Sequence, residues 1–386
     1  MLKMLTAFTL EIDDVELAIE EIKEQIDFEG GLLKNSIGLI NCFAEFIDTG
    51  VVEALCEALP FDVVGITTSS SGTNAGESTL GLSLTVLTAD DVSFSMGYAK
   101  NAEQEQEKAI LKAYETAGKS LDEQPKFVLA YIPLLFSVAG EVFLEAIAHA
   151  GDNLPVFAPL SVDHTRDYSA SRVIVNGTAY KDAVAMVLVA GNVQPRFVLG
   201  GVTDQKTIKQ KAIITASQAN ILKEVNGMPA IEYLRSLGLI TTDGQIQGVA
   251  TMPFLVNFND GTKPVVRSIF GQTPEGYAVC GGRMPVGATL AIGSINHDVV
   301  LEATDEVLKT CMEAENVNGV LLFSCIGRNY ALGMNVLDEL QLIHNRFGKA
   351  VPFMSAYAGG EVCPVYDLDG KPQNRFHNNT IIACIL

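Results

Sequence analysis

The sequence predicts an α/β (mixed α+β) fold with mixed β-sheets in two domains, on three observations. The chain has 386 residues, of which 48% are apolar, and is too long for one ordinary core. Apolar strand-like runs alternate with helical patterns along it. One order of elements, strand–helix–strand–loop–strand, recurs three times. We therefore expect these units to form mixed sheets, with an internal duplication.

The three repeats share the same signals. An apolar run comes first, then apolar residues at three- and four-residue spacing, then two further apolar runs. A strand–helix–strand element closes as a right-handed parallel crossover, and the third strand then pairs antiparallel. The first strands lie at 37–42, 127–131 and 320–325, the helices at 51–58, 142–150 and 336–347, the second strands at 62–67, 154–158 and 350–354, and the third strands at 80–87, 183–189 and 380–386.

The domain boundary follows from local signals. Residues 206–237 have a helical pattern, and Asp243-Gly244 is a turn signal before new strand-like runs. We place the two domains at residues 1–225 and 226–386. The run 380–386 is almost wholly apolar, which predicts a central, buried strand.

Composition excludes several functions. The net charge of −20 repels nucleic acids and anionic membrane surfaces. The most apolar stretch, 127–140, contains Pro133 and is too short to span a bilayer, and the N-terminus does not read as a signal peptide. Seven cysteines, without a CxxC pair, are typical of reduced thiols. These observations predict a cytoplasmic protein.

The first candidate site is Ser324-Cys325-Ile326-Gly327-Arg328, at the end of an apolar strand. Ligands of α/β sheets bind beyond strand ends. Gly327 permits a tight turn, and Arg328 carries a fork of donors suited to a carboxylate. Equally, the pattern fits Cys325 as a small core residue and Arg328 as a residue that caps a helix or forms a structural ion pair.

Two further clusters follow near the C-terminus. Gly359-Gly360-Glu361 projects a carboxylate from a glycine loop, to pair with Arg328 or to receive a ligand amine; the alternative is a plain turn with a solvated acid. His377 and Asn378 precede the last strand, where they donate and accept hydrogen bonds or serve a purely structural role.

In the N-terminal half, Thr67 and Thr68 open a hydroxyl-rich turn after a strand. Such a turn binds an anion through backbone amides, or is a solvated loop. No dinucleotide, Walker, zinc-protease or EF-hand motif is present, and the histidines are scattered without metal-ligand spacing. We expect no cofactor and no metal.

In this order, the clusters resemble the FIST family (F-box and intracellular signal transduction proteins). The resemblance spans residues 30 to 386 and rests on Val63–Thr68, Lys223–Leu234, Val266–Ile269 with Met284–Gly287, Phe323–Arg328, and Gly360–Val362 with His377–Thr380. It implies a prokaryotic sensory module that binds a small ligand such as an amino acid. The site residues it implies are Cys325, Gly327, Arg328, Gly360, Glu361, His377 and Asn378.

One departure concerns the N-terminal half of the site. Ile66 stands where the family pattern has a cysteine, and Glu77 is the nearest following acid. The resemblance also implies that a separate signalling protein carries the output.

Three functions remain open. The leading hypothesis is a sensor for an amino acid or related carboxylate, with Arg328 on the ligand carboxylate and Glu361 on its amine. The rival is a cysteine-dependent enzyme acting on a small metabolite, with Cys325 as nucleophile and His377 as its base. The third is a scaffold whose acidic surface docks a basic partner.

Overall fold

The computed structural model describes residues 1–135, 140–151, 154–165, 167–202, 207–246 and 251–386. Within this part of the chain, the strands form three six-stranded sheets and one eight-stranded sheet. Both parallel and antiparallel pairs occur in each six-stranded sheet. The predicted mixed α+β class is therefore confirmed.

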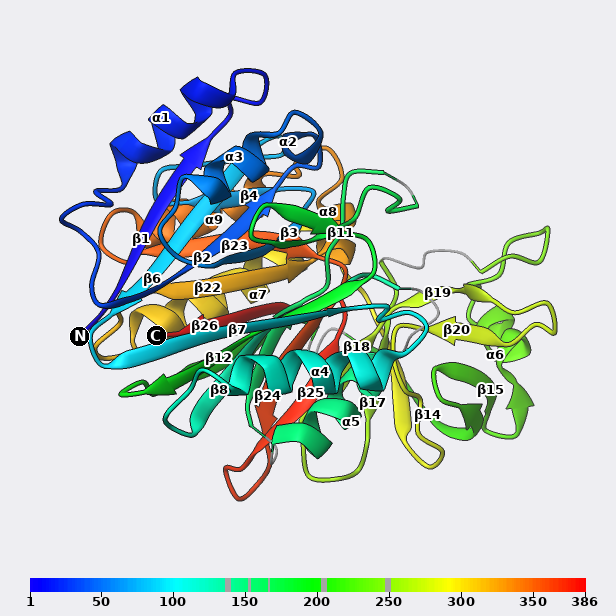
Figure 1. Ribbon diagram of the computed structural model, residues 1–386. Coiled ribbons are helices and arrows are strands. Elements are labelled where there is room, and N and C mark those ends of the chain that lie inside the picture. Colours follow the sequence, from blue (N-terminus) through cyan, green and yellow to red (C-terminus); the bar gives the residue numbers. More distant parts are fainter. Residues whose placement is uncertain (136–139, 152–153, 166, 203–206, 247–250) are drawn as a thin grey trace.

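Three units with one order of elements build the six-stranded sheets (Figure 1). Unit 1 comprises β1 (Leu2–Thr9), α1 (Val15–Gln25), β2 (Asn35–Cys42), α2 (Glu45–Asp48), α3 (Val51–Glu57), β3 (Val63–Thr67), β4 (Ser71–Thr73), β5 (Gly76–Ser78) and β6 (Leu82–Ala89). Unit 2 comprises β7 (Val92–Lys100), α4 (Gln106–Gly118), β8 (Pro125–Tyr131), α5 (Gly140–Gly151), β9 (Val156–Pro159), β10 (Val173–Val175), β11 (Thr178–Tyr180) and β12 (Ala183–Gly191). Unit 3 comprises β13 (Arg196–Gly200), α7 (His297–Met312), β22 (Val320–Cys325), α8 (Ile326–Leu332), α9 (Asp338–Phe347), β23 (Phe353–Ala358), β24 (Glu361–Tyr366), β25 (Pro372–His377) and β26 (Ile381–Ile385).

Strand pairing repeats in the three units. The first and second strands of each repeat are parallel: β2 with β3, β8 with β9, and β22 with β23. The third strand pairs antiparallel with the first: β6 with β2, β12 with β8, and β26 with β22. The predicted threefold repeat is confirmed, and β26 is central and buried, as expected, between β13 and β22.

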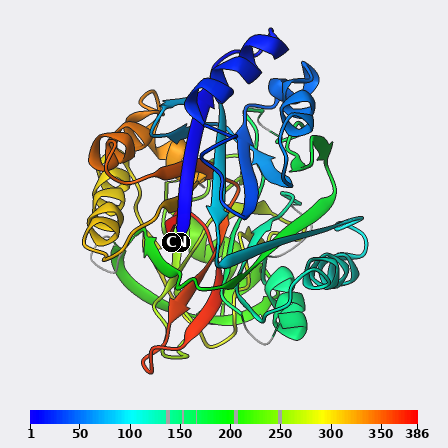
Figure 2. The same ribbon diagram turned by 60° about the vertical axis from the view of Figure 1, so that its left-hand side comes forward.

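Each unit also exchanges a hairpin with another unit. Hairpin β4–β5 of unit 1 joins the sheet of unit 3, where β4 pairs with β23. Hairpin β10–β11 of unit 2 joins the sheet of unit 1, and hairpin β24–β25 of unit 3 joins the sheet of unit 2. The exchange is cyclic, so the three units hold one another in a single body (Figure 2).

The inner faces of the three sheets share one hydrophobic core. Leu39, Leu129 and Phe323 of the first strands all belong to it. The outer faces pack on helices in separate clusters, one for each unit. Apolar strands buried on both faces are what this layering requires.

Unit 3 carries an inserted lobe between β13 and α7, at the right of Figure 1. Its core is a cluster of its own, drawn from residues 212–292. Its eight-stranded sheet contains β14 (Thr207–Gln218), β15 (Ile221–Val225), β16 (Met228–Pro229), β17 (Phe254–Asn257), β18 (Val265–Arg267), β19 (Ile269–Gln272), β20 (Ala278–Cys280) and β21 (Thr289–Gly293), and one helix, α6 (Ala230–Ser236), packs on it.

The predicted helix over residues 206–237 is wrong for most of its length. Residue 206 lies outside the described part, residues 207–229 contain three strands, and only α6 is helical. The sheet of the lobe recruits this segment through β21 and β20, and tertiary pairing overrides the local helical spacing.

Two kinds of feature are absent from the described residues. No helix there is long and apolar enough to cross a membrane. No group of three or more His, Cys, Asp or Glu side chains in the same ranges is arranged to hold a metal ion.

Candidate functional site

The site residues of the C-terminal half lie at neighbouring strand ends of unit 3. Cys325 ends β22 and forms the N-cap of α8, which carries Arg328 in its first turn. Glu361 begins β24 and is paired in register with His377, at the end of β25. All four side chains are buried. The fold thus brings segments far apart in the sequence to one end of the sheets.

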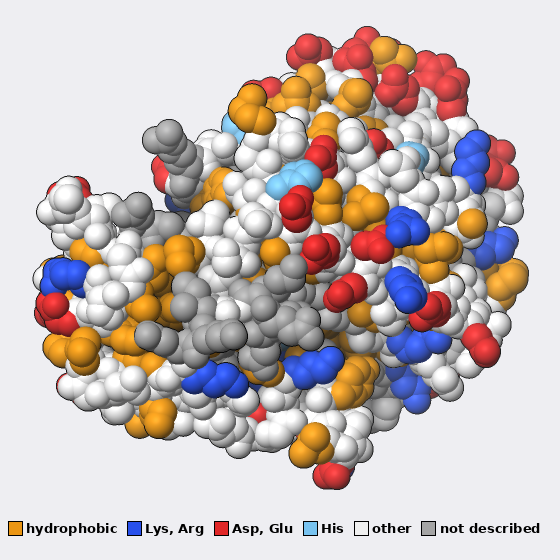
Figure 3. All heavy atoms as spheres, turned by 180° about the vertical axis from the view of Figure 1, so that it is seen from behind, with side chains coloured by type: hydrophobic (Ala, Val, Ile, Leu, Met, Phe, Trp, Pro, Cys, Tyr) orange, Lys and Arg blue, Asp and Glu red, His pale blue; other side chains and the backbone are white. Residues whose placement is uncertain are grey.

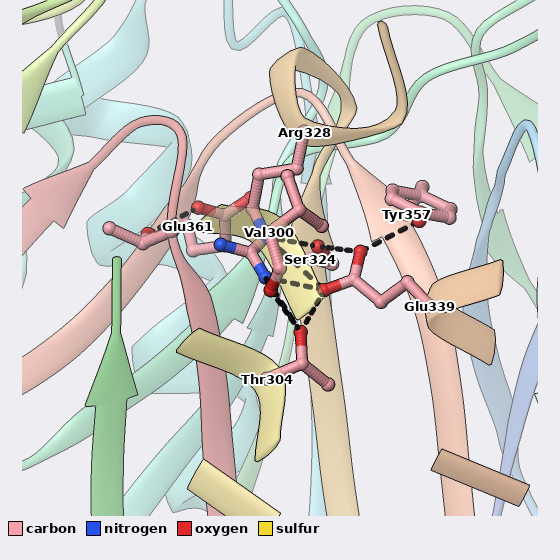
Figure 4. Close-up of polar contacts among 8 residues, drawn as sticks. Val300, Thr304, Ser324, Arg328, Glu339, Tyr357 and Glu361 are labelled. Carbon is pink, nitrogen blue, oxygen red and sulfur yellow. Dashed lines mark hydrogen bonds and ion pairs between the residues drawn. The ribbon is translucent and has the colours of Figure 1, made fainter. Parts of the chain in front are cut away.

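Arg328 is held by a carboxylate of the same chain (Figure 4). Its Nη2 atom lies 2.6 Å from Oε1 of Glu339 on α9 and also donates to Thr304 Oγ1 at 2.7 Å. Its Nε atom donates to Ser324 Oγ at 3.0 Å. The structural ion pair considered for Arg328 is therefore present, and its carboxylate partner is Glu339.

Glu339 accepts hydrogen bonds from several elements at once. Besides Arg328, its oxygens accept from Thr304 on α7 at 2.6 Å, Ser324 on β22 at 2.8 Å and the Tyr357 hydroxyl on β23 at 2.7 Å. Burial raises the pKa of this carboxyl, but Arg328 and the hydroxyl donors outweigh burial and hold it below its usual value. Glu339 is therefore a buried anion through which α9 is bonded to α7, to α8 and to two strands of the sheet.

Glu361 lies beside the Arg328–Glu339 pair, but its hydrogen bonds and the direction of its pKa shift differ from those of Glu339. Its Oε2 atom accepts from Thr380 Oγ1 at 2.9 Å, whereas its Oε1 atom is buried without a hydrogen-bond partner. Burial raises the pKa of this carboxyl well above its usual value; Thr380 and Arg328 lower it, and the negative charge of Glu339 raises it further. One guanidinium therefore faces two carboxyl groups, and Glu339 already neutralises it.

Cys325 and His377 have environments that oppose nucleophilic catalysis. Burial, and then the nearby Glu361 carboxyl group, raise the pKa of the Cys325 thiol far above its ordinary value, so the reactive thiolate is suppressed. Burial, and then Arg267, lower the pKa of His377 to about 3. The His377 ring directs Nε2 at the Cys363 carbonyl oxygen, at 3.2 Å. A Cys325–His377 catalytic pair has no support in these contacts.

Asn378 and the glycines fix the backbone around these groups. Asn378 Oδ1 accepts from the backbone N–H of Ser268 at 3.2 Å, which ties the site to the inserted lobe. A Cβ atom on Gly327 would lie 2.1 Å from Asn379 Oδ1, so a larger residue there would displace the buried Asn379 amide. Gly360 has φ of 140°, a conformation that L side chains rarely adopt.

Thr67 and Thr68, the predicted N-terminal contribution, bond to backbone groups. Thr67 Oγ1 accepts from the backbone N–H of Arg172 at 2.8 Å. Thr68 Oγ1 lies 2.8 Å from the Tyr357 carbonyl oxygen, to which it donates. Thr68 is therefore bonded to β23, the strand whose Tyr357 hydroxyl donates to Glu339.

Glu339 and Thr380 are site residues that sequence reasoning missed. A signal for Glu339 existed: it shares the inner face of α9 with Leu340, Ile343 and Phe347, where a lone acid needs a buried partner. Thr380 is the first residue of the otherwise apolar run 380–386, and its hydroxyl donates to Glu361.

An open cleft of about 700 Å³ adjoins this cluster. Its walls come from β13 and α7 on one side and from β17 and β18 of the inserted lobe on the other. Buried His377 and Thr380 lie at its inner end, and exposed Lys263 lies at its rim. The polar cluster of unit 3 is thus connected to a space large enough for a small molecule.

The repeated sheets with their inserted lobe define a two-part mixed α+β protein, and comparison gives its family. The chain belongs to the FIST family: the FIST N domain matches residues 38–228 and the FIST C domain residues 230–364. FIST domains are associated with signal transduction and sensing. The predicted boundary at 225/226 remains a prediction, and the sheet of unit 3 takes strands from both sides of it.

The comparisons with curated proteins and with solved structures give no match or only weak similarity. No curated protein matches the chain. Among solved structures, cyanuric acid hydrolase from A. caulinodans is similar at 9% identity and a TM-score of 0.35, over 100% of this chain and 98% of that one. PurLQS from Thermotoga maritima is similar at 9% identity and a TM-score of 0.20, over 99% of this chain and 72% of that one. Scores this low carry no argument about fold or function.

Proposed function

We propose that this protein is a sensor that binds an amino acid or a related small carboxylate in the cleft between unit 3 and the inserted lobe. The observation that carries the proposal is the position of His377 and Thr380. Both are buried polar residues at the inner end of a space of about 700 Å³, and Thr380 bonds to Glu361 behind it. A cleft that combines apolar walls with polar groups at defined positions is the usual form of a small-ligand site.

Lys263, rather than Arg328, is the cation suited to the ligand carboxylate. The Nε and Nη2 atoms of Arg328 are occupied by groups of the chain, and Arg328 is not among the residues that line the cleft. Lys263 is exposed on the lobe side of the cleft. An ammonium group on a flexible stem can reach a carboxylate in the cleft.

The protein can sense a ligand because the two walls of the cleft belong to different parts of the chain. One wall belongs to unit 3 and the other to a lobe with its own hydrophobic core, so a ligand that contacts both favours their closed arrangement. The output passes to a separate signalling protein in the cytoplasm. Acidic side chains gather over α1, at the top of Figure 3, and suit a partner with a basic surface; they include exposed Glu16, Glu20 and Glu24.

The test is a thermal shift measurement with the twenty amino acids and a set of small carboxylates. A ligand at 100 times its Kd stabilises the folded protein by about 2.7 kcal/mol, which raises Tm. Val299, half-buried on the α7 wall of the cleft, is replaced by Trp to fill the space. The matched control is Met312→Trp, on an exposed position of the same helix outside the cleft.

We expect the wild type and Met312→Trp to respond to the same compound and Val299→Trp to lose the response. If no compound raises the Tm of the folded wild type, or if Val299→Trp responds equally, the cleft is not a sensor site.

A further inference from the structure

Three buried side-chain atoms in and beside the cluster at the cleft have no hydrogen-bond partner: Glu361 Oε1, His377 Nδ1 and Asn379 Oδ1. Their residues are fully buried. A buried polar atom left without a partner destabilises the folded protein. His377 Nδ1 and Asn379 Oδ1 each lack a hydrogen-bond donor, and Glu361 Oε1 would need one once the carboxyl group has lost its proton.

The role of His377 follows from its other ring nitrogen. Nε2 faces the carbonyl oxygen of Cys363, which can only accept, so Nε2 carries the proton. Burial keeps the ring neutral by lowering its pKa to about 3. Nδ1 is therefore an unprotonated acceptor, and a ligand carboxylate would be repelled there.

The charges of the neighbouring side chains also favour a positively charged ligand group. Arg328 is the guanidinium beside both Glu339 and Glu361, and Glu339 is bonded to it directly. Arg328 is already paired with Glu339, so Glu361 has no cation of its own among these groups, and a buried carboxyl group without one favours its neutral, protonated form. The groups around Glu361 are Arg328 on α8, Glu339 on α9, Cys325 at the end of β22, Cys363 on β24 itself, His377 opposite on β25 and Thr380 before β26.

Thr380 provides the connection from the cleft to Glu361. It lines the cleft, and its hydroxyl donates to Glu361 Oε2 at 2.9 Å. The oxygen of the same hydroxyl can accept a bond from a ligand N–H group. A ligand donor at the inner end of the cleft is therefore one hydroxyl away from the carboxyl group.

We propose that the inner end of the cleft receives a primary ammonium group, held by Thr380 and His377, and that its arrival displaces a proton from Glu361 to solvent. The proposal rests on the sensor function above and fixes the orientation of its ligand, with the ammonium inward and the carboxylate toward Lys263. The step balances: the O–H bond of the neutral carboxyl breaks, its proton passes to water, and the carboxylate left behind pairs with the ligand cation.

The experiment uses two chain-matched probes of opposite charge, 3-methylbutylammonium and 4-methylpentanoate. Calorimetric titration in two buffers of different ionisation enthalpy counts the protons released. Glu361→Gln keeps the shape of the side chain and removes its charge, and Thr380→Val interrupts the connection. The matched control is Glu313→Gln, an exposed acid at the end of α7.

We expect the ammonium probe to bind with release of close to one proton, and its affinity to rise up to tenfold per pH unit while Glu361 is neutral. Glu361→Gln should abolish the proton release and weaken binding about tenfold or more, Thr380→Val should weaken binding, and Glu313→Gln should change neither quantity. Absence of ammonium binding, or binding without proton release, overturns the proposal. If the carboxylate probe or an uncharged compound binds instead, the orientation is refuted while the sensor function stands; if nothing binds, both fall.

Discussion

Replacing Glu339 by Gln should remove a large part of the stability of the fold. Glu339 is fully buried and neutralises Arg328, which is itself buried. Breaking a buried ion pair from one side costs about 3–5 kcal/mol, because it leaves the other charge uncompensated. The amide nitrogen of Gln would also meet a hydroxyl that now donates, such as Tyr357, at a cost of about 1–3 kcal/mol. Domains are commonly stable by only about 5–15 kcal/mol.

The assay is urea unfolding followed by far-UV circular dichroism, since the chain contains no Trp. The control is Asp305→Asn, which breaks the exposed ion pair with Arg346 and should cost less than about 1 kcal/mol. An equal, small loss in Glu339→Gln and Asp305→Asn would refute the reasoning. The double variant Arg328→Met/Glu339→Leu should be more stable than the sum of the single losses predicts, by about 1 kcal/mol or more.

The contribution of Glu339 to the free energy of unfolding should depend on pH. The pKa of Glu339 is lowered in the folded protein, so its contribution to stability is present above the unfolded pKa and is lost as pH falls through the folded pKa. The difference in unfolding free energy between wild type and Glu339→Gln should therefore be largest near neutral pH and shrink in acid. A difference that stays constant from neutral pH to acid would contradict the assignment of the charge to Glu339.

Three further predictions follow from the contacts. Gly327→Ala should lower Tm, since its Cβ would lie 2.1 Å from Asn379 Oδ1, whereas Gly118→Ala, with no atom within 4 Å, should be neutral or stabilising; equal effects would contradict the close approach. Cys325 should react with iodoacetamide about a hundredfold more slowly in the folded than in the unfolded protein, because burial raises the pKa of its thiol; fast, selective labelling measured by mass spectrometry would restore the enzyme hypothesis. Deleting residues 381–386 should abolish cooperative thermal unfolding, because β26 pairs on both sides; a retained transition would show that the strand is dispensable.

The repeat was predictable because its signals are local. In each unit, the strands are apolar runs and the helices have apolar residues at three- and four-residue spacing. The helices predicted in this way correspond to α3, α5 and α9. The cyclic exchange of hairpins was not predictable. The pairing of β4 with β23 joins residues such as Thr73 and Met354, which are far apart in the sequence, and nothing in either short strand specifies its partner.

The candidate site was predictable only in part, for a related reason. Strand ends and glycine turns pointed to Cys325, Arg328, Glu361 and His377, and these residues do lie at neighbouring strand ends. Which charge pairs with which depends on side-chain packing across several elements. The sequence alone could pair Arg328 with Glu361, whereas the fold places Glu339 against it and leaves Glu361 with an unpartnered oxygen.

The cleft itself depends on the insertion in one repeat. The first strand and the first helix are joined by residues 10–14 in unit 1 and 101–105 in unit 2, but by residues 201–296 in unit 3. The inserted lobe has a separate core, so replacing 201–296 with the linker 10–14 should leave the repeated sheets folded. Because one wall of the cleft comes from the lobe, the variant should lose any ligand-dependent rise in Tm. A folded variant that still responds to the ligand would show that sensing resides in the repeats alone.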